Sequence, residues 1–456
     1  MSRRDLAGPR LSISLPERLA PFRYTMGATG GLIAASVLTS ATGFAFWLFA
    51  ARQYPVDAVG LAGAAVSAML LLSQIAVLGL GTSLAGVLHR EPRPASLSVT
   101  AMVASGVAGV LLGLGFGLLA PLLSSELEPI SATPLALVVF VAGVAVSAVV
   151  AVLDQVLVSV SRNVLQLVRN AAFGFGRLPL LVVAAVLLAP DGMAIYAAWL
   201  LGTVVSLAVL VTLVHDTRLA GGVRPLMWSR LRDMASDALA HHVVNLSRSA
   251  SVWLLPLMVT VMLSSEANAA FYIAFMMSNL ILLVGKQATF TLYVVGARAP
   301  ETLWRQARFT LGLSAAASLI GTIAFTLVGR QLLALFGESY AASAYPTLAI
   351  LALSALPVLV KDHWIAIQRV QGSVSRAAIV GVVFLLLELA AAAVGAVWAG
   401  LVGFAIARLV ALLVQAAFMA PTLLSAIARP TTAAHAAAVA VPVEVEVEGE
   451  RQGGER

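Results

Sequence analysis

Residues 135–153 of the chain read LALVVFVAGVAVSAVVAVL, and this stretch decides the class of fold. It contains no charged residue and is long enough to cross a bilayer, which takes about 20 apolar residues in a helix. The whole chain has the same character, since 60% of its 456 residues are hydrophobic and only 11% are charged. Soluble domains are about 45–50% apolar and about 25% charged. The sequence therefore predicts a polytopic membrane protein and excludes a soluble enzyme, a secreted domain and a nucleic-acid-binding protein.

Twelve stretches of this kind follow one another along the chain. Each is apolar enough and long enough for one membrane-spanning helix. They lie at residues 27–51, 58–88, 95–120, 133–160, 164–189, 193–215, 238–263, 266–294, 307–329, 345–370, 376–397 and 399–425. We therefore expect an all-α polytopic membrane protein with about twelve transmembrane helices. The last two stretches require a very short turn between them.

The longest polar loop in this pattern, residues 216–237, divides the chain into two halves of six spans. We expect an N-lobe at 27–215 and a C-lobe at 238–425, with the loop as a cytoplasmic linker. A basic cytoplasmic tail, 1–26, precedes the first span. The C-terminal tail, 426–456, is of low complexity, and such segments are typically disordered.

The positions of Arg and Lys set the orientation of the chain in the membrane. With twelve spans, most of the 28 Lys and Arg residues fall on one side, and only Arg52 and Arg330 fall in loops on the other. Positive loops remain in the cytoplasm, so we expect a multi-pass protein of the cytoplasmic (inner) membrane with both termini inside. Cysteine is absent, which excludes disulfides and thiolate zinc sites, and we expect no metal or cofactor.

The fifth span carries the clearest polar pattern inside the membrane. Arg162, Gln166, Arg169 and Arg177 are spaced so that a helix presents them on one face. Arg162 and Arg169 lie close enough to the membrane surface to anchor the helix there. Arg177 lies too deep for its side chain to reach the surface, which favours a water-filled cavity over a lone structural pair.

Further charges lie within or near the other spans, where each is costly unless it faces a cavity or a partner. The candidate phosphate-binding residues share a positive charge: Arg169, Arg177, Arg248, Lys286 and Lys361. The acids that either carry a coupling ion or neutralise one of these cations are Asp154, Asp362 and Glu388. Cations predominate, which predicts a positive cavity. Since arginine suits phosphate, a cargo with one or two phosphates in its head group fits such a cavity best.

Small residues predict close helix packing in the third span. Gly109, Gly113 and Gly117 are spaced by four and form one ridge on a helix. Such ridges let the backbones of neighbouring membrane helices approach closely.

Several short stretches of the chain together carry a resemblance to a known family. They are FWLFAARQY at 46–54, VGLA at 59–62, LGLGT at 78–82, LDQ at 153–155 with RN at 169–170, FYIA at 271–274 and LFGESY at 335–340. On these stretches the chain resembles the polysaccharide and oligosaccharide (O-antigen-type) flippases of the multidrug/oligosaccharidyl-lipid/polysaccharide exporter superfamily. The resemblance covers residues 24–425.

The resemblance implies a transporter and not an enzyme. The implied fold has two six-helix lobes arranged as a V, works by alternating access and encloses a cationic cavity, whose cations correspond to Arg177, Arg248 and Lys286. The implied cargo is a polyprenyl-pyrophosphate-linked oligosaccharide for surface polysaccharide biosynthesis. Implied partners are membrane lipids and a glycan polymerase or glycosyltransferase, with no role for nucleic acid.

Three other functions remain open. A multidrug or cation antiporter of the same fold should have an acidic cavity, and the related antiporters often carry an acid in the first span, which is uncharged here. A membrane-bound sugar polymerase or ligase needs a sizeable outer loop, and the outer loops are short. A non-transporting component of a glycan-assembly complex is compatible with every pattern above.

Overall fold

The structure, a computed structural model, describes residues 23–160, 162–214, 226–299 and 302–428. Apart from one short 3-10 helix, its regular elements are α-helices. In chain order they are α1 (Arg23–Gln53), α2 (Val56–Ala76), α3 (Leu80–Val87), α4 (Pro94–Leu123), η2 (Ser125–Ile130), α5 (Pro134–Ser159), α6 (Asn163–Leu187), α7 (Gly192–Val214), α8 (Trp228–Asp233), α9 (Ala235–Met262), α10 (Ser265–Arg298), α11 (Leu303–Ala334), α12 (Glu338–Ser343), α13 (Tyr345–Leu353), α14 (Ala355–Val370) and α15 (Val374–Ala428). The predicted tails fall largely outside the described residues, as does 216–225 of the expected linker. Most of the remaining linker forms α8 and the start of α9.

Twelve membrane-crossing segments can be traced through the described helices. Nine stretches are long and apolar enough to span a bilayer, one of them running from α13 into α14. Another, α15, is two helices, because Ala399 and Gly400 leave the helical conformation, with Gly400 at φ 58°. Together with α1 and α9, this gives the expected twelve. The all-α polytopic fold is confirmed, and the short turn between the last two spans lies at Ala399–Gly400.

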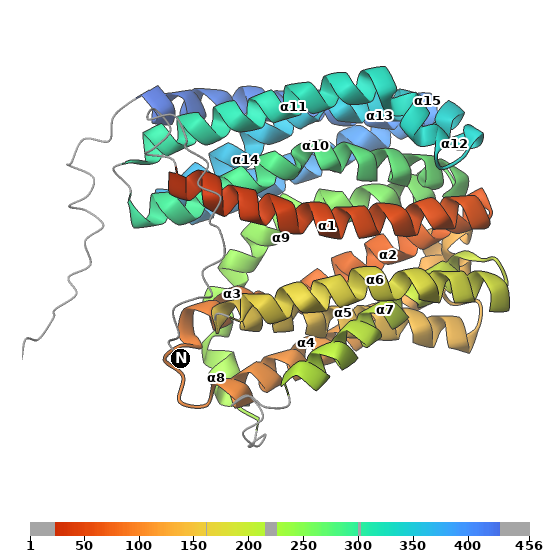
Figure 1. Ribbon diagram of the computed structural model, residues 1–456, viewed down its shortest axis with the longest axis horizontal. Helices are drawn as coiled ribbons and strands as arrows, with labels where there is room; N and C mark the ends of the chain where they lie inside the picture. Colours follow the sequence, from red (N-terminus) through yellow and green to blue (C-terminus); the bar gives the residue numbers. More distant parts are fainter. Residues whose placement is uncertain (1–22, 161, 215–225, 300–301, 429–456) are drawn as a thin grey trace, which may run out of the picture.

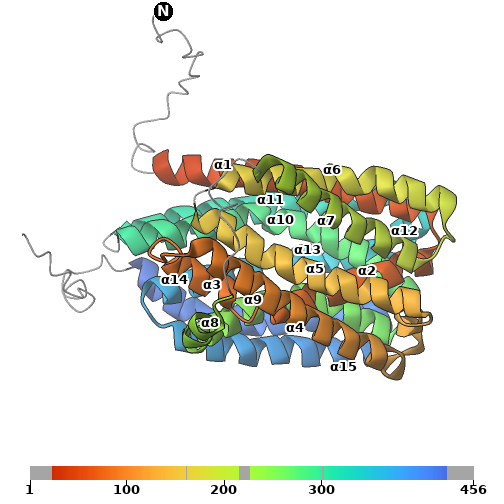
Figure 2. The ribbon, with the colours of Figure 1, turned by 90° about the horizontal axis from the view of Figure 1, so that it is seen from below.

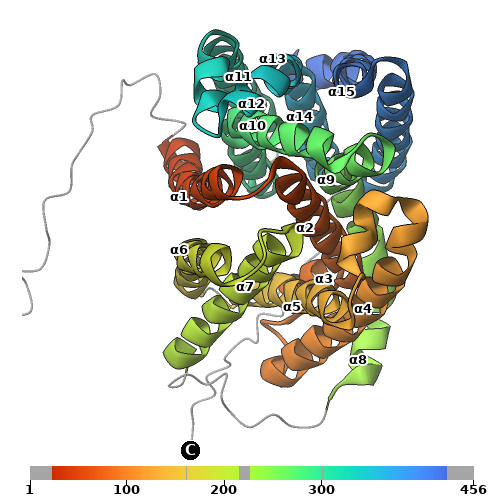
Figure 3. The ribbon, with the colours of Figure 1, turned by 90° about the vertical axis from the view of Figure 1, so that its right-hand side faces the viewer.

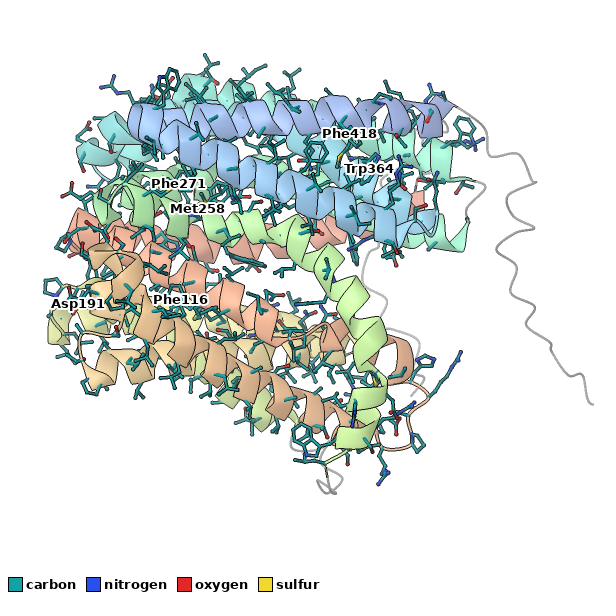
Figure 4. The ribbon with its side chains drawn as sticks, turned by 180° about the vertical axis from the view of Figure 1, so that it is seen from behind. Phe116, Asp191, Met258, Phe271, Trp364 and Phe418 are labelled. Carbon is teal, nitrogen blue, oxygen red and sulfur yellow. The ribbon has the colours of Figure 1, made fainter. Side chains whose placement is uncertain are left out.

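The helices form two sets that lie side by side (Figures 1 and 3). Helices α2 to α7 make the N-terminal set, and α10 to α15 make the C-terminal set. Helix α1 lies between them and packs on both α6 and α10. Helix α9 crosses from α3 and α8 to α15, so it spans both sets (Figure 4). Figure 2 shows α8 beside the start of α4.

The outward faces of both sets are apolar. Large side chains point away from the protein on several helices, for example Leu111 at 65% exposed, Ile320 at 67% and Val397 at 83%. A soluble protein rarely leaves so much apolar surface uncovered. Lipid is the environment that suits these faces, as expected for a multi-pass membrane protein.

The predicted glycine ridge makes the contact between α4 and α5. A Cβ added to Gly109 would lie 2.8 Å from the Cα of Ala145, and one added to Gly113 would lie 3.2 Å from the Cα of Val141. Gly117 faces the side chain of Leu137. The glycines therefore let the two backbones touch, and the predicted packing role of the ridge is confirmed.

The two sets share a core at one end of the molecule only. The largest buried cluster joins residues of both, such as Leu127 and Phe140 with Phe271 and Phe336. We call this the closed end; it holds the α1–α2 turn, η2 and α12. Towards the other end the buried clusters belong to one set each. In Figure 4, Phe271 lies near the closed end and Trp364 near the open end. This arrangement is the V-shaped pair of lobes.

Candidate functional site

Two neighbouring cavities lie among the helices and share part of their lining. The deep cavity has a volume of about 480 Å³ and lies between α1, α2, α6 and α7 on one side and α9 and α10 on the other. Nearer the open end, an inner cavity of about 420 Å³ shares Thr39, Leu70, Phe173 and Trp199 with it. Trp47 and Phe275 of the deep cavity belong to the buried cluster that joins the two sets, so this cavity reaches the core of the closed end.

Aromatic side chains make up much of the wall of the deep cavity. They come from both sets: Phe44, Trp47, Phe173, Trp199, Trp253, Tyr272 and Phe275. Such a wall accommodates the apolar part of an amphiphilic molecule. Tyr272 and Phe275 share one face of α10, but the spacing along single helices does not show that rings from five helices meet at one wall.

Arg177 of α6 lies in this wall, inside a cage of three aromatic rings. Its Cζ is 4.3 Å from the ring centre of Trp199, 4.4 Å from that of Phe173 and 5.1 Å from that of Phe46. Contacts of this kind stabilise a buried cation. They leave two of its nitrogens, Nε and Nη1, buried without a hydrogen-bond partner among the described residues.

The deep placement of Arg177 depends on small neighbours. A Cβ on Gly202 would lie 2.5 Å from the Cβ of Arg177, and a Cβ on Gly43 would lie 3.4 Å from its Nη2. Gly202 therefore admits the side chain between α6 and α7. Gly43, which also lines the deep cavity, keeps the approach to Nη2 clear.

Lys286 of α10 is the second cation that lines the deep cavity. Its Nζ donates a hydrogen bond to Oδ1 of Asn279 at 3.3 Å, and Nδ2 of Asn279 donates to the carbonyl of Phe275 at 2.8 Å. The backbone thus orients the amide, and the amide orients the ammonium. The lining residues of the deep cavity include these two cations and no carboxylate.

Arg169 lines the inner cavity and is tied to Asp154 of α5. Nε and Nη2 of Arg169 donate to the two carboxylate oxygens of Asp154 at 2.8 and 2.6 Å. Nη1 also reaches Oγ of Ser206 at 3.5 Å. Asp154 neutralises Arg169, which is the ion-pair role that the sequence left open for this acid.

Glu388 forms a second buried ion pair. Its Oε1 accepts a hydrogen bond from Nε of Arg408 at 2.9 Å, and both side chains are almost fully buried. The two residues lie on opposite halves of α15, on either side of the break at Ala399–Gly400. Neither lines the deep cavity or the inner cavity, so the structure uses this pair to hold the two halves together.

The other candidate residues do not converge on Arg177. Asp362 lines a smaller cavity of about 310 Å³ together with Lys286 and Arg369. Lys361 is buried in α14 and does not line the deep cavity. Arg248 lies in α9, but its side chain is outside the part of the structure that is described.

One polar contact near the open end was not anticipated from the sequence. Nη2 of Arg369 donates to Oδ1 of Asn245 at 2.7 Å, which joins α14 to α9. Both residues line a cavity of about 430 Å³ with His242 and Tyr293. Arg369 lies at the end of a predicted span, where an arginine commonly anchors a helix at the membrane surface. Its position in the sequence therefore does not indicate a contact with α9.

Comparison with solved structures identifies the fold. The chain is similar to the inward-facing conformation of a multidrug resistance MATE family transporter of the MOP superfamily, with a TM-score of 0.62 and 16% identity over 85% of this chain and 95% of that one. It is also similar to the outward-facing conformation of such a transporter, with a TM-score of 0.61 and 17% identity over 90% of this chain and 97% of that one. A variant of the Vibrio cholerae MATE transporter VcmN is similar with a TM-score of 0.63 and 16% identity over 89% of this chain and 98% of that one.

The fold is therefore that of the MATE transporters of the MOP superfamily. No family model matches the sequence. A search of curated proteins gave no match either. Two of these neighbours are named as multidrug resistance transporters. The polysaccharide flippase subfamily is not among the proteins that these comparisons name.

Proposed function

We propose that this protein is an alternating-access transporter that carries amphiphilic molecules with an anionic group through the deep cavity. The observation that carries the proposal is Arg177, a cation enclosed by aromatic rings, with two unpaired N–H groups and with Lys286 in the same wall. Guanidinium groups bind phosphate and carboxylate strongly. The aromatic wall suits the apolar part of the same molecule.

A lipid-linked oligosaccharide is the specific cargo that we favour. It joins an anionic pyrophosphate to a polyprenyl chain, and its sugar head would move through the cavities while the chain stays in the bilayer. The protein would then act in the cytoplasmic membrane, with both termini in the cytoplasm, during surface polysaccharide assembly. A glycan polymerase or glycosyltransferase would be its partner.

Multidrug export is the second candidate, and the two neighbours named as multidrug resistance transporters favour it. The aromatic wall of the deep cavity is compatible with a drug that has an apolar part. The charge of the deep cavity separates the two functions. A cationic drug would meet Arg177 and Lys286 with no carboxylate among the lining residues, and like charges at short range repel strongly in a low-dielectric site.

A strain that lacks the gene distinguishes the two cargos. Polyprenyl-linked intermediates would be extracted and identified by mass spectrometry, and the strain would be profiled for drug sensitivity in parallel. We expect a completed lipid-linked repeat unit to accumulate and a surface glycan to be lost. Sensitivity to organic cations with an unchanged lipid-linked pool would contradict the flippase and support drug export.

A further inference from the structure

At the closed end, two contacts join the N-terminal half of the chain to the ends of two helices of the C-terminal set. Nε of Arg52, at the end of α1, donates to the carbonyl of Leu335 at 2.6 Å, and Nη2 donates to that of Ala334 at 3.2 Å. These are carbonyls at the C-terminal end of α11. Oε2 of Glu126, in η2, accepts a hydrogen bond from the backbone N–H of Ser265 at 2.9 Å, in the first turn of α10.

Each contact places the favourable charge at a helix end. The last carbonyls of a helix have no partner within it and carry partial negative charge, so a cation such as Arg52 stabilises them. The first N–H groups carry partial positive charge, so a carboxylate such as Glu126 stabilises them. Because α10 and α11 are antiparallel neighbours, they present one end of each kind at the closed end. The N-terminal half of the chain supplies the matching charges, the carboxylate of Glu126 for the start of α10 and the cation of Arg52 for the end of α11.

The surrounding contacts fix this arrangement in one register. Nδ2 of Asn268, one turn into α10, donates to the carbonyl of Gly60 in α2 at 2.8 Å. A Cβ on Gly60 would lie within bonding distance of the carbonyl oxygen of Ser265, so only glycine allows the crossing. Phe44 of α1 also packs edge-on against Phe336, with ring centres 4.9 Å apart.

We propose that Arg52 and Glu126 form a two-point latch that holds the closed end shut and is released in each transport cycle. The inference rests on the alternating access of the proposed function, because such a transporter must separate its two sets at this end. Both contacts join a side chain to backbone, so they can break without leaving a buried charge: Arg52 is exposed and Glu126 is partly exposed.

The chain contains no cysteine, so spin labels can be placed without altering other positions. Labels at Ala132→Cys and Ser339→Cys, both exposed, report the separation of the sets at the closed end by double electron–electron resonance. Labels at His89→Cys and Ser375→Cys report the open end. The measurements use the full chain in lipid nanodiscs.

Glu126→Gln should populate a longer closed-end distance and a shorter open-end distance. Loss of a charged hydrogen bond should shift the ratio of the two conformations by roughly tenfold. Arg52→Gln should act in the same direction, more weakly because Arg52 is exposed and screened. Arg52→Lys should fall between wild type and Arg52→Gln. The matched controls, Glu128→Gln and Arg330→Gln, change exposed charges at the same end and should leave both distances as in wild type.

Distance distributions for Glu126→Gln, Arg52→Gln and their combination that match those of the two controls would overturn the latch. A variant that fails to fold would broaden both distances instead of moving them in opposite directions. If the variants fail to fold, the test is made on the spin-labelled protein that retains Arg52 and Glu126, by measuring the closed-end distance at increasing salt concentration. Salt screens the exposed contact, so a longer closed-end distance is expected, and no change would overturn the proposal. The labels measure distances between the two sets of helices and do not depend on which cargo is transported. The latch proposal can therefore be contradicted while the proposed cargo stands, and the reverse.

Discussion

Arg169 donates hydrogen bonds to both carboxylate oxygens of Asp154, at 2.8 and 2.6 Å. Two turns further along the same face of α6, Arg177 has no such acid and lies among aromatic rings with Nε and Nη1 unpaired. The two arginines share one helix face and have opposite surroundings in the fold. Arg169 is neutralised within its own set of helices, whereas Arg177 keeps its charge at the wall of the deep cavity.

Replacing Arg177 by methionine should leave the stability unchanged or raise it by about 1 kcal/mol, because a buried donor without a partner is costly. Methionine also packs well against aromatic rings. Thermal unfolding in detergent measures the effect. A marked loss of stability would mean that Arg177 holds the fold together and is not kept for a ligand.

Replacing Asp154 by alanine should destabilise the protein by about 3–5 kcal/mol, because it leaves Arg169 charged and buried without its partner. The double variant with Asp154→Ala and Arg169→Met should recover most of that loss. Thermal unfolding and membrane abundance measure both effects. Normal stability with abolished transport in the single variant would instead favour an ion-coupling role for Asp154.

The pair formed by Glu388 and Arg408 provides a parallel test in the C-terminal set. Glu388→Ala should destabilise the protein by a similar amount, since the pair is more deeply buried. Glu388→Leu combined with Arg408→Met should restore both abundance and transport, because an apolar pair of similar volume can replace a buried ion pair. A stable but inactive double variant would show that Glu388 takes part in transport.

Gly60→Ala should strongly reduce folded protein in the membrane, because the new Cβ would collide with the backbone of Ser265. Neither backbone can move without separating α2 from α10 at the closed end. The matched control is Gly115→Ala in α4, where a Cβ meets nothing within 4 Å. Equal abundance of the two variants, measured by size-exclusion chromatography after extraction, would contradict this account of the crossing.

The apolar pattern was sufficient to predict the fold class. Each membrane helix forms its backbone hydrogen bonds within itself, so it can be recognised from the length and apolar composition of its own sequence. The break between 376–397 and 399–425 was predictable for the same reason, although α15 is continuous in hydrogen bonding on either side of Gly400. The glycine ridge of α4 was also predictable, since spacing alone places Gly109 and Gly113 on one face.

The side-chain and backbone groups that each charged residue contacts could not be predicted in the same way. Helical spacing placed Arg169 and Arg177 on one face, but only the packing of α5 against α6 and α7 decides that Asp154 faces Arg169. The cage of Arg177 combines residues from three helices, of which only Phe173, one turn away, could have been anticipated. The latch residues Arg52 and Glu126 read as ordinary loop charges, because their partners are backbone groups of distant helix ends.

The most direct test of the central claim is a calorimetric comparison of two probes on the purified full-length protein. Farnesyl diphosphate is an anionic amphiphile, and ethidium is a cationic one. We predict that the protein binds farnesyl diphosphate more tightly, and that Arg177→Ala weakens this binding roughly tenfold or more, as expected for a lost charged hydrogen bond. Arg162→Ala, an exposed position at the start of the same helix, should not weaken it. Tighter binding of ethidium, with no effect of Arg177→Ala on either probe, would contradict the claim.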